Sequence, residues 1–189
     1  LVSVRSGTPT YNGQIVVRKD SGIKSVSDIK GKAFGRPDPL SASGWIIPML
    51  TLRAAGINPD KDLRKIVDAG SHDAVIAAVY KGDVEAGATY VDARIRVENI
   101  IPDVMEKVLV LEVTPDIPND GVQFSTSMPE EMRKTIVKAL IKIIKTDKGK
   151  EAFKTAYQWT DLTEKDDSFY DPFRQVLQAS GLNIKDLAE

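Results

Sequence analysis

Residues 38–47 read Asp-Pro-Leu-Ser-Ala-Ser-Gly-Trp-Ile-Ile and mark the change from an extended segment to a helix. Ser41 and Ser43 are residue types that cap helix N-termini, because a short hydroxyl accepts a hydrogen bond from an unpaired N–H. Gly44 adds no side chain, which would let a ligand approach the backbone. Free N–H groups at a helix N-terminus form an anion site. An ordinary capped helix has the same sequence, so both interpretations stay open on this stretch alone.

Around this stretch, predicted strands alternate with predicted helices. Short apolar runs predict strands at 14–18, 32–36, 63–68, 84–88 and 108–113. Capping residues and apolar spacing predict helices at 25–31, 44–55 and 72–81. This alternation is typical of an α/β fold with mostly parallel strands, whose ligands bind beyond the carboxyl ends of the strands. Residues 38–44 and 69–73 are both strand-to-helix turns, so the pattern favours a binding site there.

The second half of the chain has fewer strand signals. Two prolines and Asn119-Asp120-Gly121 predict a stiff connector over residues 114–121, followed by a strand at 122–125. Ser127 and Glu130 have the spacing of a capping box. The helix that they open is expected to place four apolar residues on one face, namely Met132, Ile136, Leu140 and Ile143. Further helices are predicted at 148–156 and 170–180, the last ended by Gly181.

Composition excludes several classes of protein. The chain has 189 residues, long enough for one domain or two small lobes. Its net charge of −1 provides no overall field for nucleic acid or an anionic membrane, so we predict no nucleic-acid partner. The absence of cysteine excludes disulfides, thiol catalysis and cysteine-zinc sites. No P-loop, G-x-S-x-G or H-E-x-x-H motif is present, and we predict neither a metal nor another cofactor.

His72 is the only histidine, and its position has two interpretations. It could close the apolar stripe formed by Val75, Ile76 and Val79, or it could donate an N–H to an oxyanion at a helix N-terminus. Tyr90 and Asp92 follow a predicted strand, and Asp120 lies in the predicted connector. Each of these three could face the same cleft, although a solvated loop side chain is the alternative for each.

The ordered set of motifs resembles that of phosphonate/phosphite substrate-binding proteins of ABC transporters. The matching segments are residues 15–23, 25–32, 38–44, 69–75, 82–88 and 117–120. The resemblance implies a type II periplasmic-binding fold with two lobes that close on a small phosphorus oxyanion, which is phosphonate, phosphite or phosphate. It also implies delivery to an ABC transporter permease, and binding without catalysis.

The resemblance also implies roles for individual residues. The family's Ser-Thr-Ser-Gly helix terminus falls on Ser41, Ala42, Ser43 and Gly44, and Ala42 lacks the threonine hydroxyl while keeping its N–H. The family's oxyanion-binding histidine falls on His72. Acidic positions that face the ammonium group of aminoalkyl phosphonates fall on Asp92 and Asp120, and Tyr90 is a further ligand-binding candidate beside Asp92.

The family pattern also predicts the domain organisation and the location. Leu1-Val2-Ser3 reads like the middle of a strand, and family members have about another third of a chain, including a signal peptide, before the match begins. We therefore expect residues 19–113 to form one nearly complete lobe. Residues 1–18 and 114–189 would form the hinge segments and part of the other lobe. A partial lobe would expose apolar surface, through which copies of the chain would associate. The expected location is periplasmic, or extracellular with a lipid anchor.

Three alternatives stay open at this point. The first is a receptor for another small anion, such as a sulfonate or a vitamin precursor. The second is a hydrolase or transferase that uses Ser41 and His72, which the fold would have to bring together. The third is the effector-sensing domain of a transcription regulator, which shares this fold type.

Overall fold

The computed structural model describes residues 1–179, and these form two compact units. The smaller unit contains residues 1–11 and 118–175, and the larger contains residues 12–117 together with residues 176–179. The boundaries fall inside two strands, β2 (Thr10–Arg18) and β6 (Val108–Pro118). The sequence suggested a change of lobe after residue 18, where β2 ends, and after residue 113, which lies within β6.

The larger unit is built on a five-stranded sheet. It contains β2, β3 (Ala33–Arg36), β4 (Lys65–Asp68), β5 (Ala86–Tyr90) and β6, in the order β4-β3-β5-β2-β6. β3 is parallel to β4 and to β5, as the sequence predicts. β2 is antiparallel to β5, which corrects the prediction for that strand and places its Gly13 beside Tyr90 at the carboxyl end of β5.

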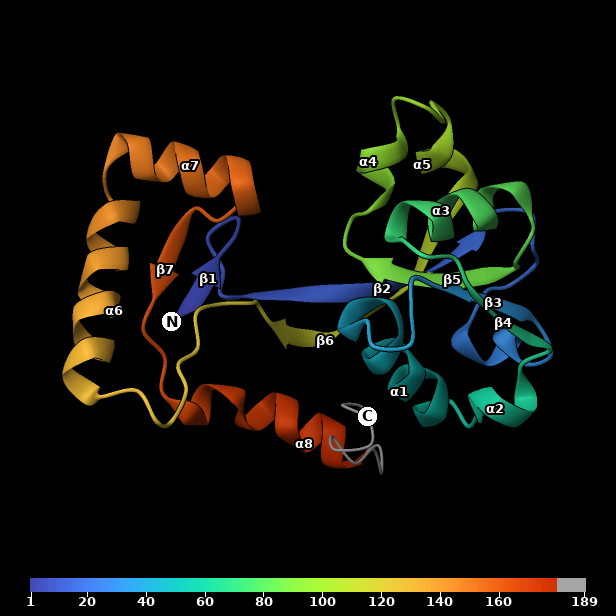
Figure 1. Ribbon diagram of the computed structural model, residues 1–189. Helices are drawn as coiled ribbons and strands as arrows, with labels where there is room; N and C mark the ends of the chain where they lie inside the picture. The colour runs from blue at the N-terminus through green and yellow to red at the C-terminus, as the bar shows by residue number, and fades with distance from the viewer. Residues whose placement is uncertain (180–189) are drawn as a thin grey trace. The chain divides into compact units, whose positions relative to one another are not determined.

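Seven helical segments belong to the larger unit. They are η1 (Val26–Ile29), η2 (Ala42–Ile46), α1 (Ile47–Ala54), α2 (Pro59–Asp62), α3 (His72–Lys81), α4 (Arg94–Val97) and α5 (Val104–Lys107). Figure 1 shows α3, α4 and α5 over one face of the sheet and α1 on the other. The stripe predicted on α3 is confirmed, because Val75, Ile76 and Val79 are fully buried.

A glycine in β5 lets α3 pack directly on the sheet. A Cβ atom at Gly87 of β5 would lie 2.6 Å from Val75 Cγ1 and 3.2 Å from Val79 Cγ2, and both valines belong to α3. Contacts this close leave no room for a larger side chain. The N-terminus of α3 is thereby held near the carboxyl ends of β3 and β5.

The smaller unit contains the antiparallel pair β1 (Val2–Val4) and β7 (Asp161–Thr163). Its helices are α6 (Glu130–Ile144), α7 (Asp147–Tyr157), η3 (Asp167–Tyr170) and α8 (Asp171–Ala179), whose end belongs to the larger unit. Buried Ile144, Trp159 and Leu162 form its core. Figure 1 shows α6 beside β7, which agrees with this core.

Four predictions for the second half were wrong. The connector begins later than predicted because residues 114–118 belong to β6. Residues 122–125 form no strand. No side chain caps α6, since Pro129 is its N-cap. The buried face of α6 is not the predicted one. Ile144 and Leu140 pack into the core, while Met132 and Ile143 are 53% and 48% exposed. The predicted stop at Gly181 lies outside the described residues.

Candidate functional site

The candidate site lies at the edge of the sheet where β3, β4 and β5 end. Because these strands are parallel, the turns that follow them lie at the same edge. Gly13 of β2 lies next to two of the turns. It pairs with Tyr90, and a Cβ atom at Gly13 would lie 2.6 Å from the Ser43 carbonyl oxygen. The structure therefore brings the start of η2 close to the end of β5.

The first turn presents unpaired backbone N–H groups. Ser41 is the N-cap of η2, and its Oγ accepts the N–H of Gly44 at 3.1 Å. The N–H groups of Trp45 and Ile46 both donate to the Ser41 carbonyl oxygen, at 2.9 Å. Among residues 1–179, the N–H groups of Ala42 and Ser43 have no hydrogen-bond acceptor. Two donors therefore remain available at this helix end.

The structural role of Gly44 differs from the one that the sequence suggested. A Cβ atom at this position would overlap the Cδ and Cγ atoms of Pro37 and lie 2.8 Å from Ser41 Oγ. The space beside Gly44 is therefore filled by protein, and the glycine serves the packing of the turn against Pro37. The interpretation that it leaves room for a ligand was wrong.

The second turn places His72 against Tyr90. Ser71 caps α3, and its Oγ accepts the N–H of Ala74 at 3.1 Å. The Tyr90 N–H donates to His72 Nδ1 at 3.4 Å, and the two rings meet edge to face with centroids 4.7 Å apart. Because Nδ1 accepts this bond, the proton of the neutral ring is on Nε2. His72 can therefore donate one N–H from Nε2.

The charge of His72 depends on its surroundings. Burial lowers the pKa of His72, while the carboxylates of Asp38 and Asp73 act in the opposite direction. The ring is therefore neutral near pH 7 when no ligand is present. Burial also raises the pKa of the Tyr90 hydroxyl, so this side chain is neutral as well.

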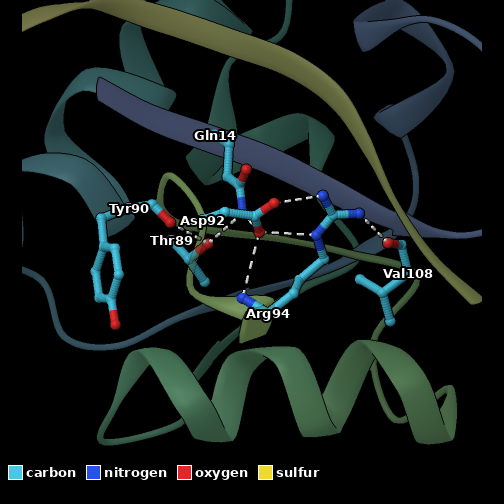
Figure 2. Close-up of polar contacts among 6 residues, drawn as sticks. All are labelled: Gln14, Thr89, Tyr90, Asp92, Arg94 and Val108. Atoms are coloured by element: carbon cyan, nitrogen blue, oxygen red, sulfur yellow. Dashed lines mark hydrogen bonds and ion pairs between the residues drawn. The ribbon is translucent and has the colours of Figure 1, made fainter. Parts of the chain in front are cut away.

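Asp92 is held in an ion pair with Arg94. Figure 2 shows the Arg94 guanidinium facing the Asp92 carboxylate, with Nε 2.8 Å from Oδ1 and Nη2 2.6 Å from Oδ2. Gln14 Nε2 donates to Asp92 Oδ1 at 3.3 Å and to Thr89 Oγ1 at 3.2 Å. Arg94 Nη1 donates to the Val108 carbonyl oxygen at 2.7 Å. The hydrogen bonds from Arg94 hold the pKa of Asp92 below its ordinary value, so this carboxylate is ionised.

Asp120 belongs to the smaller unit, where it is also paired with an arginine. Its Oδ1 lies 2.8 Å from Arg5 Nη2 and accepts a hydrogen bond from Ser3 Oγ at 3.5 Å. The Asp120 side chain is 53% exposed, so the pair is solvated. Within the smaller unit, Asp120 is therefore already the partner of an arginine.

Two arginines near the strand ends were missed. Arg36 ends β3, with Nε 2.5 Å from Asp68 Oδ1 and its guanidinium 4.5 Å from the centre of the Trp45 ring. Arg96 lies 3.3 Å from Asp73 and close enough to Tyr90 that each affects the other's pKa. Arg36 could have been found from the sequence as the last residue of a predicted strand. Arg96 had no such signal.

The described residues contain neither a candidate metal site nor a candidate membrane span. Over residues 1–179, no group of three or more histidine, cysteine, aspartate or glutamate side chains could hold a metal ion. No helix in the same residues is long and apolar enough to cross a membrane.

The family model for the periplasmic substrate-binding protein of the phosphonate ABC transporter matches residues 1–170. Among curated proteins, the phosphonates-binding periplasmic protein of Escherichia coli K12 is 25% identical over 174 residues. The alignment covers 90% of this chain and 51% of the E. coli protein. The chain therefore spans about half the length of that relative.

Solved structures show the same fold. A binding protein component of the ABC phosphonate transporter of Pseudomonas aeruginosa is 24% identical, with a TM-score of 0.77 over 95% of this chain and 61% of its own. A Xanthomonas citri protein bound to chloride is 20% identical and has a TM-score of 0.82. The match covers 96% of this chain and 69% of that protein. A Prochlorococcus marinus protein in complex with methylphosphonate is 20% identical, with a TM-score of 0.71 over 95% and 70%. These similarities show the type II periplasmic-binding fold predicted from the sequence.

Proposed function

Because the chain belongs to the family of phosphonate-binding periplasmic proteins of ABC transporters, we propose that it binds a small phosphorus oxyanion for import. The oxyanion would be a phosphonate, phosphite or phosphate. Members of this family are substrate-binding proteins rather than enzymes. The E. coli relative is described as periplasmic and phosphonate-binding, which supports both the ligand class and a location outside the cytoplasm.

One observation supports this function best: two capped helix starts lie at the same sheet edge. The first has the N–H groups of Ala42 and Ser43 beside the Ser41 hydroxyl, and Ser43 is a buried polar residue. The second offers the Nε2–H of His72. An anion at a helix N-terminus is favoured by the free N–H groups and by the helix dipole. Hydrogen bonds to an ionised oxygen are stronger than those between neutral groups.

We propose binding without turnover. Ser41 Oγ accepts the Gly44 N–H, so the hydroxyl already has a structural role as a cap. His72 Nδ1 accepts the Tyr90 N–H, which leaves only Nε2 to face a ligand. Both groups are therefore arranged as fixed hydrogen-bonding groups, which supports recognition over nucleophilic catalysis.

An ABC transporter permease is the proposed partner, since the family delivers its ligands to one. We also propose that copies of this chain associate through β6, which lies at the edge of the sheet. Its Leu109, Val110 and Val113 are between 36% and 50% exposed. An exposed apolar edge strand is a surface for pairing with another chain. Sedimentation analysis of the 189-residue chain would test this, and a monomer at all concentrations would contradict it.

A thermal-shift panel on this chain tests the proposed function. The ligands are methylphosphonate, phosphite, phosphate and 2-aminoethylphosphonate, with sulfate as the competing anion. A ligand present at a hundred times its dissociation constant should add about 2.7 kcal/mol to the free energy of unfolding. We expect a shift with at least one phosphorus oxyanion and a smaller one with sulfate. No shift with any phosphorus oxyanion would contradict the proposal.

A further inference from the structure

The turn that presents the N–H groups of Ala42 and Ser43 is closed by Trp45. The Trp45 N–H donates to the Ser41 carbonyl oxygen at 2.9 Å, so this residue fixes the turn directly after the two donors. Trp45 is buried, with 6% of the residue exposed, and its ring lies 6.1 Å from the Phe34 ring at an angle of 57°. The position of the Trp45 ring is therefore coupled to the position of the two N–H groups.

Arg36 places its guanidinium against this ring. The guanidinium carbon lies 4.5 Å from the centre of the Trp45 ring, a distance at which a cation is attracted by the ring face. The same guanidinium pairs with Asp68, with Nε 2.5 Å from Oδ1 and Nη2 3.5 Å from Oδ2. Because the hydrogen bond from Arg36 lowers the pKa of Asp68, this carboxylate is ionised. The Arg36 side chain is 16% exposed, so most of it faces protein rather than solvent.

The register of the sheet gives Arg36 this position. Arg36 and Asp68 are paired residues at the ends of the parallel strands β3 and β4. The backbone is fixed as well, because the Arg36 carbonyl oxygen accepts the Ala69 N–H at 2.8 Å. The next carbonyl oxygen, that of Pro37, accepts the Gly70 N–H at 2.9 Å. Arg36 is therefore anchored to the end of β4 through its backbone and its side chain, and its guanidinium reaches η2 from there.

We propose that Arg36 is a positioning residue, which stacks on Trp45 and so holds the N–H groups of η2 in the direction that an oxyanion needs. This inference rests on the proposed function and adds a residue to that site. Hydrogen bonds weaken steeply when donor and acceptor lose their alignment, so donors are most effective when the residues behind them are held in place. Arg36 acts through Trp45 rather than by touching the ligand, since its guanidinium already has Asp68 and Trp45 as partners.

Isothermal titration calorimetry of the 189-residue chain with methylphosphonate tests the effect on affinity. Arg36→Met keeps an apolar stem beside Trp45 and removes the guanidinium. We expect it to weaken binding at least fivefold, by the same factor at low and at high salt, because a change of position is not screened. Arg64→Met is the matched control, because it removes a guanidinium from an exposed pair with Glu85 at the other end of β4. It should change the dissociation constant less than twofold.

A double-mutant cycle shows whether Arg36 acts through the ring. Trp45→Leu removes the ring, so adding Arg36→Met to that variant should cause less than a twofold further loss of affinity. Arg36→Lys keeps a cation near the ring but lacks the planar fork of the guanidinium, so it should recover only part of the loss.

Amide hydrogen exchange measures the same contact without a ligand. The N–H groups of Trp45 and Ile46 both donate to the Ser41 carbonyl oxygen. In Arg36→Met they should exchange at least threefold faster relative to the amides of α3, because the turn that they close is held less firmly. Arg64→Met should leave this ratio unchanged.

The inference is overturned if Arg36→Met behaves like the Arg64→Met control in affinity and exchange. It is equally overturned if the loss of affinity disappears at high salt, which would show that the Arg36 charge acts on the anion directly, or if the loss is as large without the Trp45 ring. If Arg36→Met does not fold, Arg36→Lys compared with Arg64→Lys decides the same question by exchange. Failure of the folded, unchanged chain to bind any phosphorus oxyanion would instead contradict the proposed function, and exchange would still test whether Arg36 holds the turn.

Discussion

In the turn before η2, Ser41 accepts the N–H of Gly44 at 3.1 Å, and in the turn before α3, Ser71 accepts the N–H of Ala74 at the same distance. The caps match, yet the surroundings differ. The first turn is packed against Pro37 and continues into buried residues, whereas Ser71 is exposed. The second turn instead adds an imidazole that is fixed by Tyr90. The same capping chemistry thus accompanies free backbone N–H groups in one turn and a titratable side chain in the other.

The largest expected effect is on stability, and it is tested by replacing one glycine in each turn. Gly44→Ala would force a Cβ atom into Pro37, so we expect a loss of about 3 kcal/mol in unfolding free energy, the upper range for overpacking. Gly70→Ala is the matched change in the second turn. Gly70 has φ of +84° and no atom within 4 Å of the new Cβ, so only backbone strain of about 1 kcal/mol is expected. Chemical denaturation of both variants measures the difference. Equal losses would show that Pro37 does not constrain the first turn.

The second prediction concerns the imidazole, which only the second turn provides. His72→Ala should weaken oxyanion binding at least tenfold, about 1.4 kcal/mol, because the Nε2–H donor is lost. Calorimetry with methylphosphonate measures this change. His72→Gln keeps an N–H donor near the same place and should lose less. An unchanged dissociation constant for the alanine variant would remove His72 from the site.

The third prediction separates the two caps. Ser41→Ala and Ser71→Ala should each cost about 1 kcal/mol of stability, because each leaves one helix N–H without its acceptor. Ser41→Ala should also weaken oxyanion binding, since its hydroxyl lies beside the free N–H groups of Ala42 and Ser43. Ser71→Ala should leave binding nearly unchanged. Denaturation and calorimetry on the same samples test both parts, and equal binding losses would contradict the assigned difference between the turns.

Local patterns predicted much of this site because its basic units are local. A serine cap needs only the three residues that follow it, so Ser41 and the start of α3 at His72 could both be predicted from the sequence. Sequence order also predicted that the two turns share a sheet edge, since parallel strands place their carboxyl ends together. The family resemblance then suggested the proposed ligand class, which capping chemistry alone does not specify.

Contacts between distant segments could not be predicted in this way. The Asp92 pair depends on Gln14, which is 78 residues away in sequence and reaches it only because β2 is antiparallel to β5. The role of Gly44 depends on how the turn folds back on Pro37. The prolines at 115 and 118 suggested a connector, but they are compatible with β6 because an edge strand does not need every N–H for its ladder.

The smallest expected effect is the pH dependence that His72 gives to the second turn. Burial lowers the pKa of His72 in the folded chain below the value of about 6.5 of the unfolded chain. Its contribution to stability is therefore fully present above about pH 6.5, where both states are neutral. It is lost as the pH falls toward the folded pKa, because the unfolded chain then binds the proton more readily.

His72 is the only histidine, so the difference in stability between the unchanged chain and His72→Gln isolates the contribution of His72 protonation. Denaturation midpoints at pH 7.5 and pH 5.5 should show that the unchanged chain loses more stability at the lower pH than the variant does. Methylphosphonate should shrink that difference, because an anion beside the ring favours the imidazolium form and raises its pKa. Parallel losses with and without the ligand would mean that the ring is not beside the bound anion. In that case the second turn would offer only backbone groups to the anion.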